Sequence, residues 1–128
     1  MIYVDSSVVL ADVLTENRTP SAEFWRQSLV SSRLLQFEVW NRIHVRASAQ
    51  AQSDRATALL ARVDMLDLTE RVLARALKPF PIHVRTLDAL HLATMEFLRT
   101  EGQEIELATY DRRLAAAAGA LGIALYAL

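Results

Sequence analysis

The feature that most limits the possible folds is the alternation of short β-prone runs with helical segments along the whole chain. The runs expected to form strands are Met1–Val4, Leu29–Val30, Met65–Leu68, Ile105–Thr109 and Ile123–Tyr126. Strands that alternate with helices favour a parallel sheet, because a parallel connection needs a long crossover that is usually a helix. We therefore expect an α/β fold in which helices cover both faces of the sheet.

Apolar residues at helical spacing, together with capping residues, predict the helices between these strands. The expected helices are Ser6–Leu14, Ser21–Gln27, Arg33–Ala49, Ser53–Leu60, Glu70–Leu77, Thr86–Leu98 and Leu114–Leu121. Pro79 and Pro81 force a break in the chain, since proline does not continue a helix. Gly102 and Gly122 are expected to end the last two helices.

The length and net charge of the chain limit the number of domains and the ways in which it could bind nucleic acid. A chain of 128 residues with 52% apolar content fits one compact domain, which we expect to span residues 1–128. Fourteen basic residues against fifteen acidic ones leave a net charge of -1, so no global positive field attracts nucleic acid. Binding of a polyanion would need local help, for instance from a bound cation.

The sequence at neither end of the chain has the pattern of a membrane segment. Asp5 comes too early for the apolar part of a signal peptide. Leu114–Leu128 carries no charge, but it is shorter than the ~20 residues of a spanning helix, and Gly119 and Gly122 interrupt it. The absence of cysteine suits a reducing compartment. We expect a soluble, cytoplasmic protein that has no membrane partner.

One carboxylate stands in an otherwise apolar helix. In the segment RTLDALHLATM, Asp88 shares a helical face with His91, Leu92 and Met95. Burial of a carboxylate is costly unless a partner compensates it. The partner could be Arg85 with help from the helix dipole, or it could be a bound cation.

Four acids are expected to meet at one edge of the sheet. Asp5 ends the first strand, Asp111 follows the fourth, and Glu38 and Asp88 lie near the starts of two helices. In open parallel sheets, ligands bind at the carboxyl ends of the strands. Unpaired carboxylates gathered there would repel one another, and a hard divalent cation such as Mg²⁺ or Mn²⁺ removes the conflict.

Each of these acids also has a simpler structural interpretation. Asp5 and Asp111 could be N-caps of helices, which is a common role for aspartate. Glu38 could pair with Arg42 one helical turn later. A zinc site is not expected, because the three histidines have no ligand spacing such as H-E-x-x-H, and His91 is expected to pack beneath its helix.

Four blocks of the sequence resemble the PIN-domain ribonucleases, and among these the VapC-type toxins of toxin–antitoxin pairs. The blocks are IYVDSSVVL, FEVWNRI, RTLDALHLA and LATYDRRLAAAAGALGI, in that order, so the resemblance covers essentially the whole chain. It implies a PIN-like three-layer fold with a five-stranded parallel sheet flanked by helices. It also implies an endoribonuclease that hydrolyses RNA phosphodiester bonds with Mg²⁺ or Mn²⁺.

The resemblance can be carried to single residues. Asp5, Glu38, Asp88 and Asp111 match the acidic quartet of the family, which implies that they bind the metal and are catalytic. Ser6 and Thr109 match hydroxyl positions near that metal, where they would orient an acid or a water.

The resemblance also implies protein partners, namely a second copy in a homodimer and a cognate antitoxin. The antitoxin would lay a segment over the acidic edge and insert an arginine or lysine there. The apolar groove expected to receive it includes Val8, Val9, Phe24, Trp25 and Trp40.

Two other classes of protein compete with this interpretation. The first is a PIN-like binding module that has lost catalysis and serves in a protein or nucleic-acid complex. The second is a phospho-acceptor receiver domain, which would need an acidic pair after the first strand and a lysine after the last. Asp5 is followed by two serines and the only lysine is Lys78, so the receiver domain is disfavoured.

Overall fold

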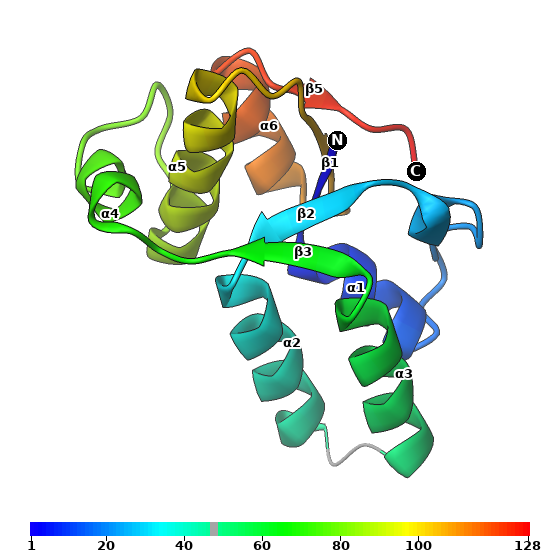
Figure 1. The fold of residues 1–128 in the computed structure, drawn as a ribbon. Coiled ribbons are helices and arrows are strands. Elements are labelled where there is room, and N and C mark those ends of the chain that lie inside the picture. Colours follow the sequence, from blue (N-terminus) through cyan, green and yellow to red (C-terminus); the bar gives the residue numbers. More distant parts are fainter. Residues whose placement is uncertain (47–48) are drawn as a thin grey trace.

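The computed structural model, which describes residues 1–46 and 49–128, has a five-stranded parallel sheet between two layers of helices (Figure 1). The strands are β1 (Ile2–Val4), β2 (Leu29–Ser32), β3 (Val63–Leu66), β4 (Glu106–Ala108) and β5 (Ala124–Leu125). Their spatial order is β3-β2-β1-β4-β5, and every pair is parallel. The predicted α/β class and parallel sheet are confirmed.

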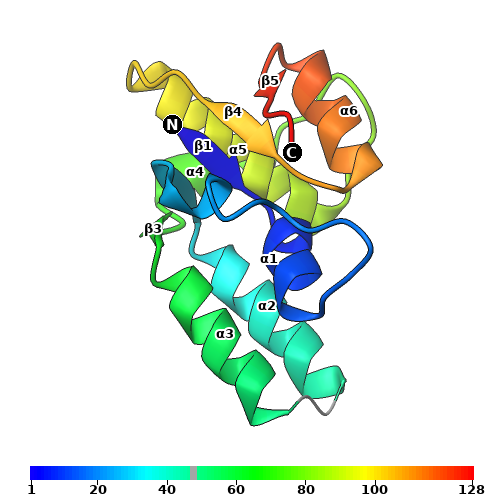
Figure 2. The ribbon, with the colours of Figure 1, turned by 90° about the vertical axis from the view of Figure 1, so that its right-hand side faces the viewer.

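Helices cover both faces of the sheet. One layer consists of α1 (Ser6–Val13), α2 (Leu34–Val45) and α3 (Gln50–Leu60), which pack against one another. The other contains α5 (Thr86–Thr100) and α6 (Arg112–Ala120), and α4 (Glu70–Ala76) packs against α5 (Figures 1 and 2). No helix in the described ranges is long and apolar enough to cross a membrane.

The central strand β1 is buried on both faces. Ile2 and Val4 point into the core formed with α1, α2 and α3, whereas Tyr3 joins Leu92 and Met95 of α5 on the opposite side. Side chains of a strand alternate between the two faces, so three consecutive apolar residues fill both cores. Continuous apolar runs are typical of parallel strands covered on both sides.

Glycine ends the two longest helices of the second layer, as the sequence predicts. Gly102 follows the end of α5 with a φ of +84°, and Gly122 follows the end of α6 with a φ of +75°. A residue with a Cβ is disfavoured in this left-handed conformation.

The helix predicted over Ser21–Gln27 is wrong, since only a 3-10 turn, η1 (Phe24–Arg26), forms there. Phe24 and Trp25 are adjacent in the sequence and are both buried in the core next to α1. The amides of Phe24, Arg26 and Gln27 each donate to the carbonyl three residues earlier, so the segment closes in tight turns instead of continuing as an α-helix.

The third strand begins two residues earlier than predicted. It spans Val63–Leu66 rather than Met65–Leu68, and Leu29 to Ser32 of β2 pair with these four residues in register. Val63 is buried in the core, but the exposed Asp64 follows it, so the sequence shows no continuous apolar run at the start of this strand. Position in the sheet outweighs the local pattern here.

The boundary between α2 and α3 also differs from the prediction. The helix predicted to reach Ala49 ends at Val45, and part of that prediction, at Ala47 and Ser48, lies outside the described residues. The next helix begins at Gln50, ahead of the serine and aspartate predicted to cap it.

The apolar groove predicted on the first helices is also wrong. Val8, Val9, Phe24 and Trp25 are all buried, and Trp40 is partly buried. These side chains are needed for the core between the sheet and its first helical layer. The four buried side chains are therefore not available to a partner.

The winding of the sheet changes direction between β1 and β4. The chain builds β2 and β3 on one side of β1, then crosses over and adds β4 and β5 on the other. At such a switch point the connections after the two central strands lead to opposite faces of the sheet, which leaves a crevice at the carboxyl ends of the strands. The residues that follow β1 and β4 border this crevice.

Candidate functional site

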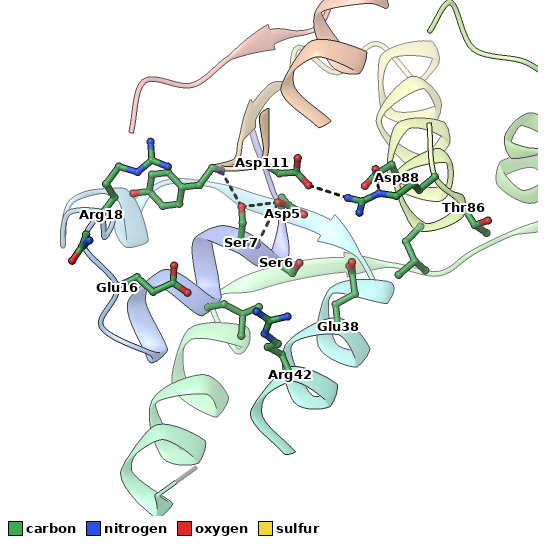
Figure 3. A pocket seen from close by; sticks show the side chains of 15 residues that line it. Asp5, Ser6, Ser7, Glu16, Arg18, Glu38, Arg42, Thr86, Asp88 and Asp111 are labelled. Atoms are coloured by element: carbon green, nitrogen blue, oxygen red, sulfur yellow. Dashed lines mark hydrogen bonds and ion pairs between the residues drawn. The ribbon is translucent and has the colours of Figure 1, made fainter. Parts of the chain in front are cut away.

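An open pocket of about 1070 Å³ lies at this crevice (Figure 3). It is lined by all four predicted acids, which come from four separate segments: Asp5 after β1, Glu38 in α2, Asp88 in the first turn of α5, and Asp111 before α6. The pocket also contains Glu16 and three arginines, Arg18, Arg42 and Arg85. The structure thus brings together the acids that the sequence predicts to converge.

Asp5 is buried and held by hydroxyl groups. Its Oδ2 accepts hydrogen bonds from Ser7 Oγ at 2.7 Å, from Thr109 Oγ1 at 2.8 Å and from the Ser7 amide at 3.3 Å. The last bond makes Asp5 the N-cap of α1, as one structural interpretation predicts. Within the described residues Oδ1 accepts no hydrogen bond, so this oxygen is left for another ligand.

The same hydroxyls join the segment after β1 to the segment after β4. Ser7 Oγ accepts from the Tyr110 amide at 2.9 Å, and Thr109 Oγ1 accepts from the Asp111 amide at 2.9 Å. These bonds fix Asp5 and Asp111 relative to each other. Supporting hydrogen bonds of this kind hold functional side chains in a fixed geometry.

Of the two hydroxyl residues that the resemblance places near the metal, Thr109 bonds to Asp5, but the second hydroxyl that reaches Asp5 belongs to Ser7 and not to Ser6. Ser6 lines the pocket without a hydrogen bond to Asp5 among the described residues. The signal for Ser7 is its position as the second helical residue, because an N-cap carboxylate turns towards the N–H groups at that position and the next.

Glu38 pairs with a buried histidine rather than with Arg42. His91 Nε2 donates to Glu38 Oε1 at 2.5 Å, and His91 Nδ1 lies 2.7 Å from the hydroxyl of Tyr3. His91 is packed beneath α5, as predicted, and it also links Glu38 to the central strand. Helical spacing cannot reveal this contact, which joins residues 53 positions apart.

The carboxylate changes the protonation of this histidine. Burial lowers the pKa of His91, but the hydrogen bond and the negative charge of Glu38 outweigh it, with smaller contributions from Asp5 and Asp88. The net result is a raised pKa. A protonated His91 would strengthen its bond to Glu38, since bonds between charged groups are stronger than neutral ones.

Asp88 and Asp111 share one arginine. Arg85 Nε donates to Asp88 Oδ2 at 3.4 Å, and Arg85 Nη2 lies 3.5 Å from Asp111 Oδ2, as the dashed lines in Figure 3 mark. Asp111 is also the N-cap of α6, where its Oδ1 accepts from the amides of Arg113 and Leu114. The predicted hold of Arg85 on Asp88 is confirmed, and its contact with Asp111 is new.

The acids influence one another across the pocket. Burial raises the pKa of Asp88, Arg85 lowers it, and the negative charges of Asp111 and Asp5 raise it again, so that the pKa remains raised. The lining has five carboxylates and three guanidinium groups, which leaves two negative charges. A dication would remove both the repulsion and this excess.

The donor chemistry of the pocket fits a hard cation, although the side chains stand apart. Within the described ranges no three His, Asp or Glu side chains form a group ready to hold a metal ion. Arg85 lies against two of the acids and His91 holds a third. The available donors are carboxylate oxygens without any thiolate, which is the set that Mg²⁺ and Mn²⁺ prefer.

Comparison with known proteins agrees with the sequence blocks. Residues 2–120 match the PIN domain family. The chain is similar to three proteins of Mycobacterium tuberculosis. Ribonuclease VapC46 is 35% identical over 98% of this chain and 96% of its own, and ribonuclease VapC47 is 32% identical over 89% and 87%. Ribonuclease VapC35 is 31% identical over 99% of this chain and 96% of its own.

Proposed function

The chain belongs to the PIN domain family, and on that premise we propose that it is a VapC-type endoribonuclease that depends on Mg²⁺ or Mn²⁺. The observation that carries the proposal is the convergence of Asp5, Glu38, Asp88 and Asp111 on one pocket at the switch point of the sheet. Each of these acids comes from a different segment. A purely structural role for each acid does not require that they meet.

In this proposal the four carboxylates hold the metal. Asp5 would use Oδ1, because its other oxygen already accepts three hydrogen bonds. Asp88 and Asp111 would turn their Oδ2 atoms from Arg85 to the ion, and Glu38 would contribute the oxygen that His91 does not bind. When bound, the ion supplies Lewis-acid polarisation of a phosphoryl oxygen and an acidified water as the nucleophile.

Neighbouring side chains hold the proposed metal ligands in position. Ser7 and Thr109 keep Asp5 in one orientation, and His91 does the same for Glu38. Displacement at a phosphodiester depends mostly on positioning and charge stabilisation, so fixed carboxylates are valuable there. A side chain misplaced by ~1 Å can cost ~100-fold in rate.

The substrate we propose is RNA, which the family relatives' names as ribonucleases support. The pocket, at about 1070 Å³, is slightly larger than the ~300–1,000 Å³ typical of small-ligand sites, and it is open, as a polymer substrate requires. Arg18 and Arg42 are exposed at its wall and carry no ion pair to a carboxylate within the described residues. We assign them to the phosphates that flank the cleaved bond.

A cognate antitoxin and a homodimer belong to the same proposal. The negative excess in the pocket suits an inserted arginine or lysine of an antitoxin, which would take the position of the metal. The contact would be made around the pocket mouth, because the surface first expected to receive the antitoxin is buried.

A cleavage assay tests the proposal. Purified protein treated with EDTA should leave a fluorescently labelled RNA intact, and Mn²⁺ should restore cleavage. Asp88→Asn and Asp5→Asn should each lower the rate at saturating Mn²⁺ by at least ~100-fold. The matched control is Asp54→Asn, an exposed aspartate on α3 that lies outside the pocket.

The assay also separates the proposal from a catalytically inactive binding module. RNA that binds but is never cut at any Mn²⁺ or Mg²⁺ concentration would favour the module. Cleavage that continues undiminished in EDTA, or in Asp88→Asn, would contradict the proposed chemistry.

A further inference from the structure

Arg85 occupies the space between two of the proposed metal ligands. Its guanidinium group contacts Asp88 Oδ2 at 3.4 Å and Asp111 Oδ2 at 3.5 Å, and these two acids lie in α5 and at the N-cap of α6. The neighbouring arginines of the pocket make no such bridge among the described residues. Arg85 therefore places a positive charge between two carboxylates that would otherwise repel each other.

We propose that Arg85 is a built-in counter-cation that competes with the divalent metal for Asp88 and Asp111. The inference rests on the proposed function, since it concerns the same pocket. In the metal-free protein the guanidinium reduces repulsion between the two acids. When the metal binds, the guanidinium moves away from them.

The contacts of Arg85 are loose enough to be exchanged. Its side chain is 60% exposed, and both distances exceed the ~2.7–2.9 Å of a strong charge-assisted hydrogen bond. The pair of Arg75 and Glu96 is different, because it is 26% and 25% exposed and its shortest contact is 2.6 Å. The two carboxylates are less exposed, at 15% for Asp88 and 29% for Asp111, so the ease of exchange rests on the exposed guanidinium and its long contacts.

The guanidinium and the ion would also compete for the same atoms. Both contacts of Arg85 use the Oδ2 oxygen, whereas Asp111 Oδ1 is already engaged at the start of α6. A dication placed at the two Oδ2 atoms would lie within a few ångströms of the guanidinium, and like charges at that separation repel. Arg85 should therefore weaken metal binding.

Calorimetric titration of the EDTA-treated protein with Mn²⁺, in the absence of RNA, tests this inference. Arg85→Gln should bind Mn²⁺ roughly tenfold more tightly than the wild type, since loss of a repulsive charge near a bound ion is worth about one decade in affinity. Arg85→Lys keeps the charge and should restore affinity most of the way to the wild-type value.

Two control variants separate displacement from a general change of charge. Arg71→Gln removes an arginine that is 63% exposed and paired with Glu101 away from the pocket, so Mn²⁺ affinity should not change. Arg42→Gln removes the same charge from the pocket wall without breaking a bridge, so any gain in affinity should be clearly smaller than that of Arg85→Gln.

A second measurement does not depend on calorimetry. Thermal unfolding should show a larger Mn²⁺-induced rise in Tm for Arg85→Gln than for the wild type at the same concentration, because tighter binding to the native state stabilises it more. Arg85→Met provides a second neutral variant if Arg85→Gln proves poorly folded. Circular dichroism would confirm the fold of each.

The Mn²⁺ titration distinguishes failure of the proposed role of Arg85 from failure of the proposed function. Equal or weaker Mn²⁺ binding by both neutral variants, with measurable binding by the wild type, would overturn the role of Arg85 and leave the proposed function intact. Absence of Mn²⁺ binding by the wild type and by Arg85→Gln would overturn the metal-dependent function, and the role of Arg85 with it.

Discussion

Removal of the His91 side chain should destabilise the metal-free protein and uncouple Glu38 from the central strand. His91→Ala removes the donor to Glu38 and leaves the hydroxyl of the fully buried Tyr3 without its histidine partner. A hydrogen bond to a charged group contributes ~1.5–3 kcal/mol, and an unsatisfied buried polar group costs ~1–3 kcal/mol. These two contributions sum to roughly 3–6 kcal/mol, and the cavity left by the ring adds to the loss.

Urea denaturation in EDTA, followed by circular dichroism at pH 7, measures this loss. A double-mutant cycle with Glu38→Gln then isolates the contact between the two side chains, and we expect a coupling of about 1.5–3 kcal/mol. His91→Gln, which retains a donor at a similar reach, should recover part of the loss. A coupling below ~0.5 kcal/mol would mean that His91 does not hold Glu38.

The contribution of this pair should also depend on pH. Because the pKa of His91 is raised in the folded protein, the stability that it contributes is complete below its ordinary pKa of about 6.5 and is lost as the pH rises through the higher folded value. The difference in unfolding free energy between the wild type and His91→Ala should therefore be larger at pH 6 than at pH 9. A difference that grows with pH would refute this reasoning.

Three further predictions concern the other side chains of the pocket. Asp88→Asn should abolish cleavage and raise the metal-free Tm at pH 7 by a few degrees. The pKa of Asp88 is raised in the folded protein, so its negative charge destabilises the fold once the pH exceeds the ordinary pKa of an aspartate. At pH 3 the difference in Tm between the variant and the wild type should vanish. Ser7→Ala should cost about 1–2 kcal/mol in urea denaturation and lower kcat, whereas Ser6→Ala should cost less than half as much, since only Ser7 bonds to Asp5 and to the Tyr110 amide. Combined Arg18→Gln and Arg42→Gln substitutions should raise KM for RNA with little change in kcat, and KM should then depend less steeply on salt concentration in a cleavage series.

The sequence alone predicts the sheet and the convergence of the acids because both follow from local signals. The run at Ile2–Val4 is apolar on both faces, and Asp5 ends it with a side chain that caps the next helix. A residue at the end of a parallel strand must lie at the carboxyl edge of the sheet, so the rough position of Asp5 and Asp111 follows from their places in the chain.

The partners of these acids could not be predicted in the same way. His91 looks like an ordinary buried residue on an apolar face, and only the packing of α2 beside the sheet brings Glu38 to its ring. The contact between Arg85 and Asp111 likewise depends on how α5 and α6 are placed after the chain has crossed the sheet. Such contacts depend on tertiary structure, which spacing does not encode.

The predicted boundary of β3 was wrong because a charged residue interrupts the apolar run. Asp64 lies in β3 with its side chain exposed, so the strand looks shorter in the sequence than its pairing with β2 makes it. Apolar patterning reports the faces that are buried, and it is weakest at the edge of a sheet where one face meets water.

The bond between Thr109 and Asp5 has a consequence for the order in which the protein is made. These residues are 104 positions apart, so at ~5–20 residues per second a ribosome adds them roughly 5–20 s apart. A nascent chain that already contains Asp5, Glu38 and Asp88 still lacks the strand that pairs beside β1 and the hydroxyl that orients its first carboxylate. The nuclease activity that we propose would therefore appear only after synthesis has passed β4 and Thr109, because the first three acids alone do not form the site.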